Sequence, residues 1–148
     1  MKLVVNKKAS HEFDVHKTFT AGVMLTGPEV KSLRNKAASL RGSFVKPIGT
    51  EMFLIGAQIS PYSYADNRDY DPKRTRKLLM KKKEVHQLLE ASSQKGWSLV
   101  PLSIDLVGKF IKVQVGLARG KKQFEKRAVL KERAQKRDDE REMKKARY

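Results

Sequence analysis

The sequence predicts a mainly β fold with some α-helix, namely a small antiparallel β-barrel with packed helices and a basic C-terminal tail. Alternating apolar residues recur in several short segments that are separated by turns containing Gly or Pro, which is typical of small barrels. This alternation stops near Gly120, and a charged segment with few apolar residues follows. We therefore expect one barrel domain over residues 1–120 and a tail over residues 121–148.

The N-terminal third predicts one strand and one helix. Residues 11–16 alternate polar and apolar side chains, as a half-buried strand does. Thr26 and Glu29 have the Ser/Thr-x-x-Glu spacing of a helix capping box, and the proline between them is tolerated in a first helical turn. Apolar residues from Val30 to Ala37 recur at helical spacing, so we expect a short helix with one buried face.

The middle of the chain predicts two strands and a long loop. Residues 43–48 and 52–59 read as strands joined by a turn that contains Gly. Pro47 restricts the first of them to an edge or end position, because proline has no amide to donate. Residues 61–72 are rich in Tyr, Asp and Asn without any period, which indicates an exposed loop.

The last part of the domain predicts a helix and a hairpin. A helix opens at Arg74, carries leucines and a valine on one face, and has Gly96 placed to end it. Residues 97–107 and 110–117 alternate as two strands around a Gly108–Lys109 turn. A closed antiparallel sheet with a helix between its strands favours an OB-fold-like barrel, although periodicity does not fix the strand order.

The charge of the chain predicts a polyanionic partner. A formal net charge of +17 over 148 residues attracts phosphate, and binding that releases counterions weakens steeply with salt. Residues 121–148 hold 12 Lys or Arg against 6 Asp or Glu, so we expect this tail to be disordered alone and ordered by its partner. No apolar run is long enough to span a bilayer and no signal peptide opens the chain, so we expect a cytoplasmic protein without a membrane partner.

Five motifs occur in an order and spacing that carry a resemblance. They are Asn6-Lys7-Lys8-Ala9, Gly27-x-Glu29-Val30-Lys31-Ser32-Leu33-Arg34, Gly56-Ala57-x-Ile59-Ser60-Pro61-Tyr62-Ser63-Tyr64, Asp71-Pro72-x-Arg74-Thr75-Arg76-Lys77-Leu78-Leu79 and Gly116-Leu117-Ala118-Arg119-Gly120-Lys121-Lys122. Together they resemble the SmpB family, the SsrA-binding proteins of bacterial trans-translation. The resemblance runs from about Asn6 through Arg133.

The resemblance implies an RNA-binding adaptor and not an enzyme. Such a protein binds the tRNA-like domain of transfer-messenger RNA and delivers it to stalled ribosomes. Its tail enters the empty messenger channel beside the 16S rRNA of the decoding centre and becomes helical there. Alanyl-tRNA synthetase and elongation factor Tu act on the same RNA. We expect no cofactor, and His11, His16 and His86 are too scattered in the sequence to predict a metal site.

The resemblance also implies the site residues. Leu79 and Lys112 match RNA-contacting positions, whereas Thr20 stands where the family usually has a glutamate, and its hydroxyl can still donate to phosphate. The expected RNA-binding residues are Asn6, Lys7, Lys8, His11, Thr20, Arg74, Arg76, Lys77, Leu79, Lys112, Gly120, Lys121 and Lys122. The expected ribosome-binding residues of the tail are Phe124, Lys126, Arg127, Lys131, Arg133, Lys136 and Arg137.

Other interpretations of these residues stay open. Leu79 fits a core position equally well, and Lys81–Lys83 fit a solvated helix face. A structural ribosomal protein would also be small, basic and tailed, but it would accompany every ribosome at constant stoichiometry. A metal-dependent nuclease would need an acidic cluster to hold ions, for which the candidates are Asp66, Asp69 and Asp71.

Overall fold

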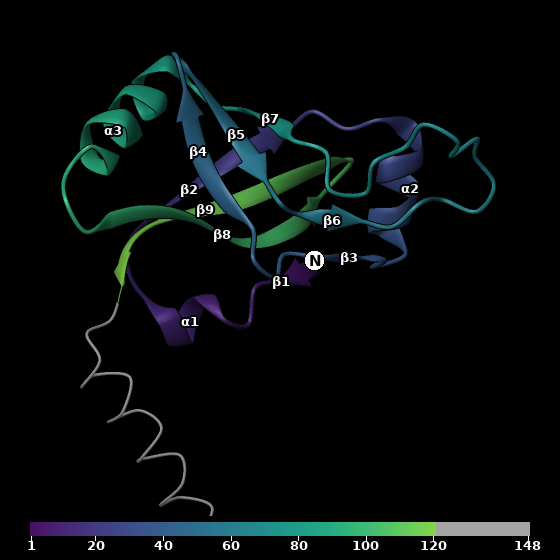
Figure 1. Ribbon diagram of the computed structural model, residues 1–148, viewed down its shortest axis with the longest axis horizontal. Coiled ribbons are helices and arrows are strands. Elements are labelled where there is room, and N and C mark those ends of the chain that lie inside the picture. Colours follow the sequence, from purple (N-terminus) through teal and green to yellow (C-terminus); the bar gives the residue numbers. More distant parts are fainter. Residues whose placement is uncertain (121–148) are drawn as a thin grey trace, which may run out of the picture.

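The computed structural model describes residues 1–120, and the predicted tail at 121–148 lies outside the described residues. Figure 1 shows a curved sheet with helices placed around it. In chain order the elements are β1 (Lys2–Val5), α1 (Ala9–Glu12), β2 (Phe13–Val23), α2 (Gly27–Arg34), β3 (Ala38–Ser39), β4 (Phe44–Ile48), β5 (Glu51–Ile55), β6 (Gln58–Ile59), β7 (Arg76–Leu79), α3 (Lys82–Ser92), β8 (Trp97–Val107) and β9 (Phe110–Gly120).

The main sheet closes on itself. Its strand order is β1-β8-β4-β5-β7-β2-β9, and β8 also pairs with β9, so the strands from β8 round to β9 form a ring with β1 attached to β8. Every pairing is antiparallel. Closure leaves few free strand edges, as in other small barrels. The predicted mainly β antiparallel fold with packed helices is confirmed.

The three longest strands lie next to one another in the barrel, and two of them, β2 and β9, contribute to the candidate site. Strands β2, β8 and β9 have 11 residues each, and β9 pairs with β8 on one side and with β2 on the other. The predicted hairpin is confirmed, and Gly108 adopts the φ of 60° that its turn requires. A register shift between Pro101 and Ser103 breaks the predicted alternation, so the buried residues Pro101 and Ile104 lie three positions apart opposite Val115 and Val113.

Helix α2 begins with the predicted capping box. The Glu29 amide donates to Thr26 Oγ1 at 3.4 Å, and the Thr26 amide donates to Glu29 Oε1 at 3.0 Å. Leu33, on the inner face of this helix, is fully buried. Because α2 ends at Arg34, Ala37 is not part of the predicted helical face.

The helix predicted to open at Arg74 is wrong in its first two turns. Residues Arg76–Leu79 form strand β7, which pairs with β5 and β2, and α3 begins only at Lys82. This short strand fills the gap between two barrel neighbours, and that pairing outweighs the local helical pattern. Gly96 has a φ of 89° in the turn before β8, beyond the end of α3 at Ser92.

Two other predicted strands have different boundaries. Residues 52–59 do not form one strand, because Gly56, with a φ of 81°, ends β5, and β6 pairs with β3 in a separate small sheet. Residues 11–16 begin in α1 and enter β2 only at Phe13. The predicted loop at 61–72 is confirmed, and this connection projects beyond α2 in Figure 1.

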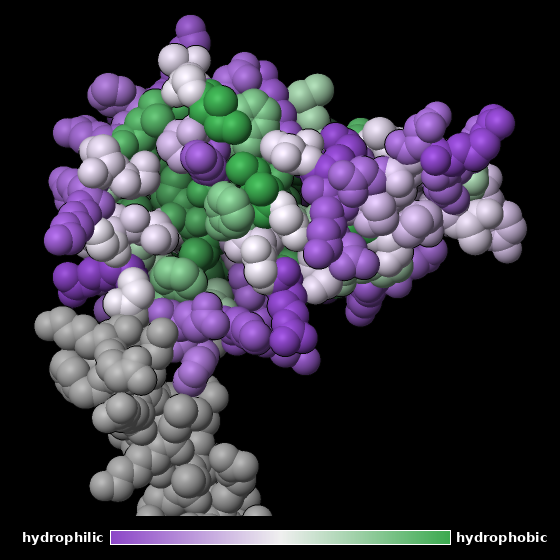
Figure 2. Space-filling model, in the orientation of Figure 1, coloured by the Kyte–Doolittle hydropathy of each residue, from purple (hydrophilic) through white to green (hydrophobic). Residues whose placement is uncertain are grey.

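The core fills the inside of the barrel. Leu33, Met52, Leu54, Leu88 and Val113 are completely buried there. Figure 2 shows a hydrophobic area on the viewed face of the barrel, whereas the region of the β6–β7 connection is mostly hydrophilic. Within residues 1–120, no helix has the length and hydropathy needed to cross a membrane.

Candidate nucleic-acid interface

A large pocket lies between the barrel wall and α3. Its volume is about 920 Å³, and its lining comes from β2, β5, β7, β9, α3 and the turns beside them. The closed barrel holds the strand side of this pocket rigid. Four of the predicted RNA-binding residues line it, namely Thr20, Lys77, Leu79 and Lys112.

Gly22 lies at the centre of a row of residues that crosses three strands. It pairs with Leu79 of β7 on one side and with Lys112 of β9 on the other. A Cβ on Gly22 would lie 3.2 Å from the Cβ of Leu79, so the glycine keeps the surface beside Leu79 open. Leu79 is 50% exposed, whereas its neighbour Leu78 is buried, so Leu79 is not a core residue.

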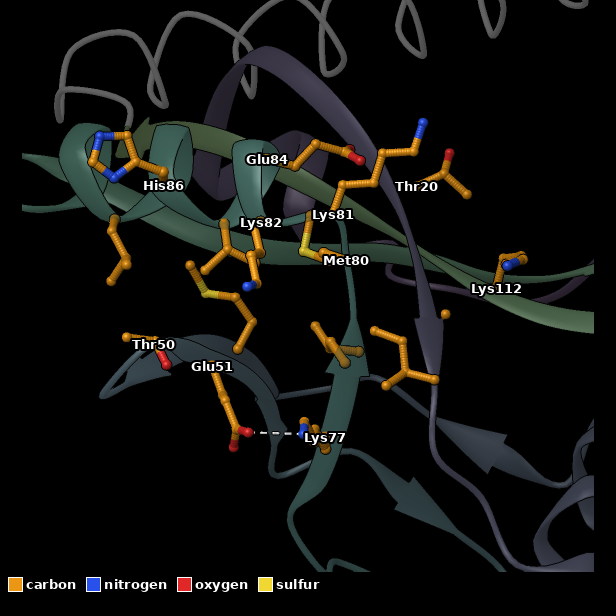
Figure 3. Close-up of a pocket in the computed structure, with 16 residues that line it drawn as sticks. Thr20, Thr50, Glu51, Lys77, Met80, Lys81, Lys82, Glu84, His86 and Lys112 are labelled. Carbon is orange, nitrogen blue, oxygen red and sulfur yellow. Dashed lines mark hydrogen bonds and ion pairs between the residues drawn. The ribbon is translucent and has the colours of Figure 1, made fainter.

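The pocket has an excess of positive charge. Four lysines and two glutamates line it, and one glutamate is paired, since Lys77 Nζ donates to Glu51 Oε1 at 2.8 Å. In Figure 3, Lys81, Lys82 and Glu84 lie on the α3 side, and Lys112 lies at the opposite end. Lysine side chains at a concave surface can contact the phosphates of an RNA backbone.

Thr20 makes a contact across two strands. Its Oγ1 donates to Oε1 of Gln114, its partner on β9, at 3.0 Å. Gln114 was not among the predicted site residues. It lies on the same strand face as Lys112, two residues away, and that alternation is the signal that could have identified it.

Arg76 does not lie at the surface. Its side chain is fully buried and donates through Nε to Glu29 Oε2 at 2.8 Å and through Nη1 to the Ala57 carbonyl at 2.8 Å. The side chain therefore has no exposed face for RNA, and the expected direct contact is wrong. Its role is to hold β7 and the preceding loop against α2.

Arg74 belongs to the same cluster but reaches the surface. Its Nε donates to both carboxylate oxygens of Glu29 at 3.1 Å, and its Nη2 pairs with Oε1 of the same residue. The side chain is 32% exposed. Arg74 is therefore mainly an ion-pair partner, with part of its surface free for another contact.

Glu29 is the centre of this cluster and is ionised. Burial raises the pKa of its carboxyl group. Hydrogen bonds from Arg74, from the Thr26 amide and from Arg76 outweigh burial and hold the pKa at about 2. The Tyr70 hydroxyl donates to Glu29 Oε2 at 3.2 Å, and burial, followed by the charge of Glu29, raises the pKa of Tyr70. The motif residues around Glu29 thus form a structural ion-pair network.

A second group of predicted residues lies at the other end of β2. Phe13, the first residue of β2, pairs with Gly120. The chain segment that leads into this end of β2 contains four more predicted residues, namely Asn6, Lys7, Lys8 and His11.

These N-terminal residues differ in how they are held. Asn6 Nδ2 donates to the Pro101 carbonyl at 2.8 Å, and the Asn6 amide donates to the Leu102 carbonyl at 2.9 Å. Asn6 therefore anchors the chain between β1 and α1 to β8. Lys7 and Lys8 are exposed. Nδ1 of His11 is buried and has no hydrogen-bond partner among residues 1–120.

The remaining predicted residues lie outside the described part of the chain. These are Lys121 and Lys122 of the RNA-binding set and Phe124, Lys126, Arg127, Lys131, Arg133, Lys136 and Arg137 of the tail.

Two of the three acidic loop residues, Asp66 and Asp71, have partners within the chain. Asp66 pairs with Arg68 at 2.8 Å, and Oδ1 of Asp71 accepts from the Lys73 amide at 2.9 Å. Among residues 1–120, no group of three His, Cys, Asp or Glu side chains is arranged to hold a metal ion. These contacts are typical of turns in an exposed loop.

Comparison with known proteins relates the whole chain to one family. A family model described as SmpB protein matches residues 3–145. An SsrA-binding protein of Staphylococcus saprophyticus is 44% identical over 146 residues, which cover 99% of this chain and 94% of the relative. One from Protochlamydia amoebophila is 42% identical over 144 residues, which cover 97% of this chain and 92% of the relative.

A solved structure agrees with this relationship. It is described as "tmRNA-SmpB: a journey to the center of the bacterial ribosome", and one of its chains is 42% identical to this one. The two folds superpose with a TM-score of 0.68, and the match covers 80% of this chain and 84% of the other. By sequence and by fold, the chain belongs to the SmpB protein family.

Proposed function

We propose that this protein is the RNA-binding adaptor of trans-translation, which binds the tRNA-like domain of transfer-messenger RNA and delivers it to stalled ribosomes. The observation that carries the proposal is the meeting of Thr20, Lys77, Leu79 and Lys112 in one basic pocket. These residues come from three strands that are distant in sequence but adjacent in the barrel.

The pocket suits a folded RNA. Structured RNA is recognised mainly through its shape, its phosphates, its 2′-hydroxyls and its unstacked bases. The lysines provide contacts to phosphate, Leu79 provides an exposed apolar surface, and Thr20 with Gln114 provides hydrogen-bonding groups. A rigid wall presents these groups without an ordering cost at each encounter.

The tail would act at the second end of the domain. Strand β9 ends at Gly120, which pairs with Phe13, so the tail would leave the domain from this end of β9. A basic tail that leaves from this point would enter a vacant messenger channel lined by 16S rRNA phosphates, whereas messenger in the channel would exclude it. The tail thus senses whether the channel is empty.

The proposed role is binding and not catalysis. Alanyl-tRNA synthetase and elongation factor Tu would act at the acceptor end of the same RNA, and the complex would work in the cytoplasm. A structural ribosomal protein would be present on every ribosome, whereas this adaptor would be found on the stalled minority. A magnesium-dependent cleavage assay on the RNA tests the nuclease alternative, and we expect no cleavage.

Two measurements test the proposal. The full chain should bind the isolated tRNA-like domain more tightly than an RNA duplex of equal length at the same salt concentration. Truncation after Gly120 should leave a folded protein that still binds the RNA through the barrel, and it should abolish peptide tagging on stalled ribosomes. Equal affinity for both RNAs would contradict the adaptor role, and normal tagging by the truncated protein would contradict the role of the tail.

A further inference from the structure

Phe110 is an exposed aromatic residue at the edge of the candidate site. It begins β9 directly after the Gly108–Lys109 turn, and 68% of its surface is exposed. A hairpin tip accepts polar residues without difficulty, so the fold does not require an aromatic ring here. The ring is therefore available to a partner.

A second pocket joins this ring to the first pocket. Its volume is about 230 Å³, and it shares Gly22, Leu79 and Lys112 with the larger pocket. The rest of its lining combines apolar side chains with one further lysine, namely Val23, Leu25, Val30, Lys109, Phe110 and Ile111. No acidic residue is among these lining residues, so the surface combines apolar walls with positive charge.

The position of Lys112 links the ring to phosphate. Its Nζ lies 5.6 Å from the centroid of the Phe110 ring, which is within cation–π distance. A base that stacks on Phe110 would therefore place its own backbone phosphate within reach of Lys112 or Lys109. Aromatic platforms next to lysines are a common way of holding unstacked bases.

We propose that Phe110 is a stacking platform for one unstacked base of the bound RNA, with Lys109 and Lys112 contacting the phosphates beside it. This inference rests on the proposed RNA-binding function and extends its site from the α3 side of the Leu79–Lys112 row to the hairpin tip. An acidic peptide would also complement the charge. A base fits better, because the pocket is continuous with the one that holds the predicted RNA contacts.

The test compares three variants of the full chain by their dissociation constants for the tRNA-like domain. Phe110→Leu keeps an apolar side chain but removes the ring, and it should weaken binding roughly tenfold. Phe110→Trp keeps a stacking surface and should stay within about threefold of the native affinity. Phe44→Leu is the matched control, since Phe44 is another exposed phenylalanine and lines neither of these two pockets.

Two further readouts identify stacking. Phe110→Leu should leave the salt dependence of binding unchanged. Lys112→Gln should lower the slope of log affinity against log salt concentration by about the amount expected for one lost phosphate contact. In RNAs that carry 2-aminopurine at single unpaired positions, fluorescence at one position should fall on binding to the native chain and to Phe110→Trp, but not to Phe110→Leu.

The outcomes separate this inference from the proposed function. If the native chain does not bind the RNA selectively, the proposed function fails and the inference fails with it. If the native chain binds and Phe110→Leu binds equally well, only the stacking role is overturned. Equal weakening by Phe110→Leu and Phe110→Trp, or by Phe110→Leu and Phe44→Leu, would also overturn it.

Discussion

The Glu29 cluster and the lysine-rich pocket use positive charge in opposite ways. In the cluster, Arg76 is completely buried and Arg74 is mostly covered, and both are paired with one ionised carboxylate. In the pocket, the lysines lie at a concave surface and outnumber the acidic residues. The first arrangement stabilises the fold, and the second is open to an external polyanion.

The boundary between these two regions runs along a single strand. In β7, Arg76 and Leu78 are buried, whereas Lys77 and Leu79 face the pocket. Successive side chains of a strand point to opposite faces, so adjacent basic residues of one motif have different roles. A basic motif therefore identifies an RNA site only after its strand register is known.

Loss of Glu29 should have the largest effect on stability. Glu29→Ala leaves Arg76 buried without its counter-charge and removes the Glu29 half of the capping box of α2, so we expect a loss of roughly 3–5 kcal/mol in the free energy of unfolding. Urea denaturation measures this change. Glu51→Ala is the control, because it breaks an exposed pair with Lys77 and should cost less than about 1 kcal/mol. Similar losses in both variants would remove the distinction between the two regions.

Acid should weaken the Glu29 cluster. The folded pKa of Glu29 is about 2, below the ordinary value of 4.5, so its contribution is complete above pH 4.5 and is lost as the pH falls towards 2. We expect this one group to account for a loss on the order of 3 kcal/mol. Unfolding experiments at about pH 5 and about pH 2.5 measure it. Glu29→Gln should show a smaller loss across this range, and an unchanged pH dependence in that variant would contradict the assignment.

Charge reversal in the pocket should affect RNA binding and leave stability nearly unchanged. Lys112→Glu replaces attraction to phosphate with repulsion, so we expect at least about tenfold weaker binding of the tRNA-like domain. The free energy of unfolding should change by less than about 0.5 kcal/mol. Lys46→Glu on β4 is the control, because Lys46 is exposed and lines neither pocket beside the Leu79–Lys112 row. Equal weakening by both reversals would indicate an effect of net charge alone.

The smallest effect should come from the Thr20–Gln114 contact. Thr20→Val removes the hydroxyl but leaves Gln114 accessible to water, so we expect only about a two- to threefold change in RNA affinity. Thr18→Val changes an exposed threonine two residues earlier on the same strand and should leave affinity unchanged. Binding titrations of the two variants side by side would show whether the hydroxyl contributes at this position.

The sequence predicted best those features that depend on neighbouring residues. The capping box of α2 requires only Thr26 and Glu29, three positions apart, and the β8–β9 hairpin is marked by long alternation on both sides of Gly108. In each case the stabilising interaction involves residues that are close in sequence, either a helix amide that is hydrogen-bonded by the capping box or the buried face of a strand.

Features that depend on distant partners could not be predicted in this way. The local pattern of residues 76–79 predicted a helix, but these residues form a strand because they pair with β5 on one side and β2 on the other. The burial of Arg76 depends on Glu29, which lies 47 positions earlier in the chain. Phe110 was predicted only as a strand residue, because its exposure is set by the closed barrel around it.

Strand β2 has a consequence for the spacing of the two ends of the domain. It begins at Phe13, beside the last described residue of β9, and it reaches Gly22 in the pocket while pairing with β9 along the way. Nine residue steps of extended strand correspond to roughly 30 Å. Under the proposed function, the length of β2 fixes a distance. It sets the separation between the bound RNA and the point where the tail departs, and this separation depends on strand length rather than on a hinge.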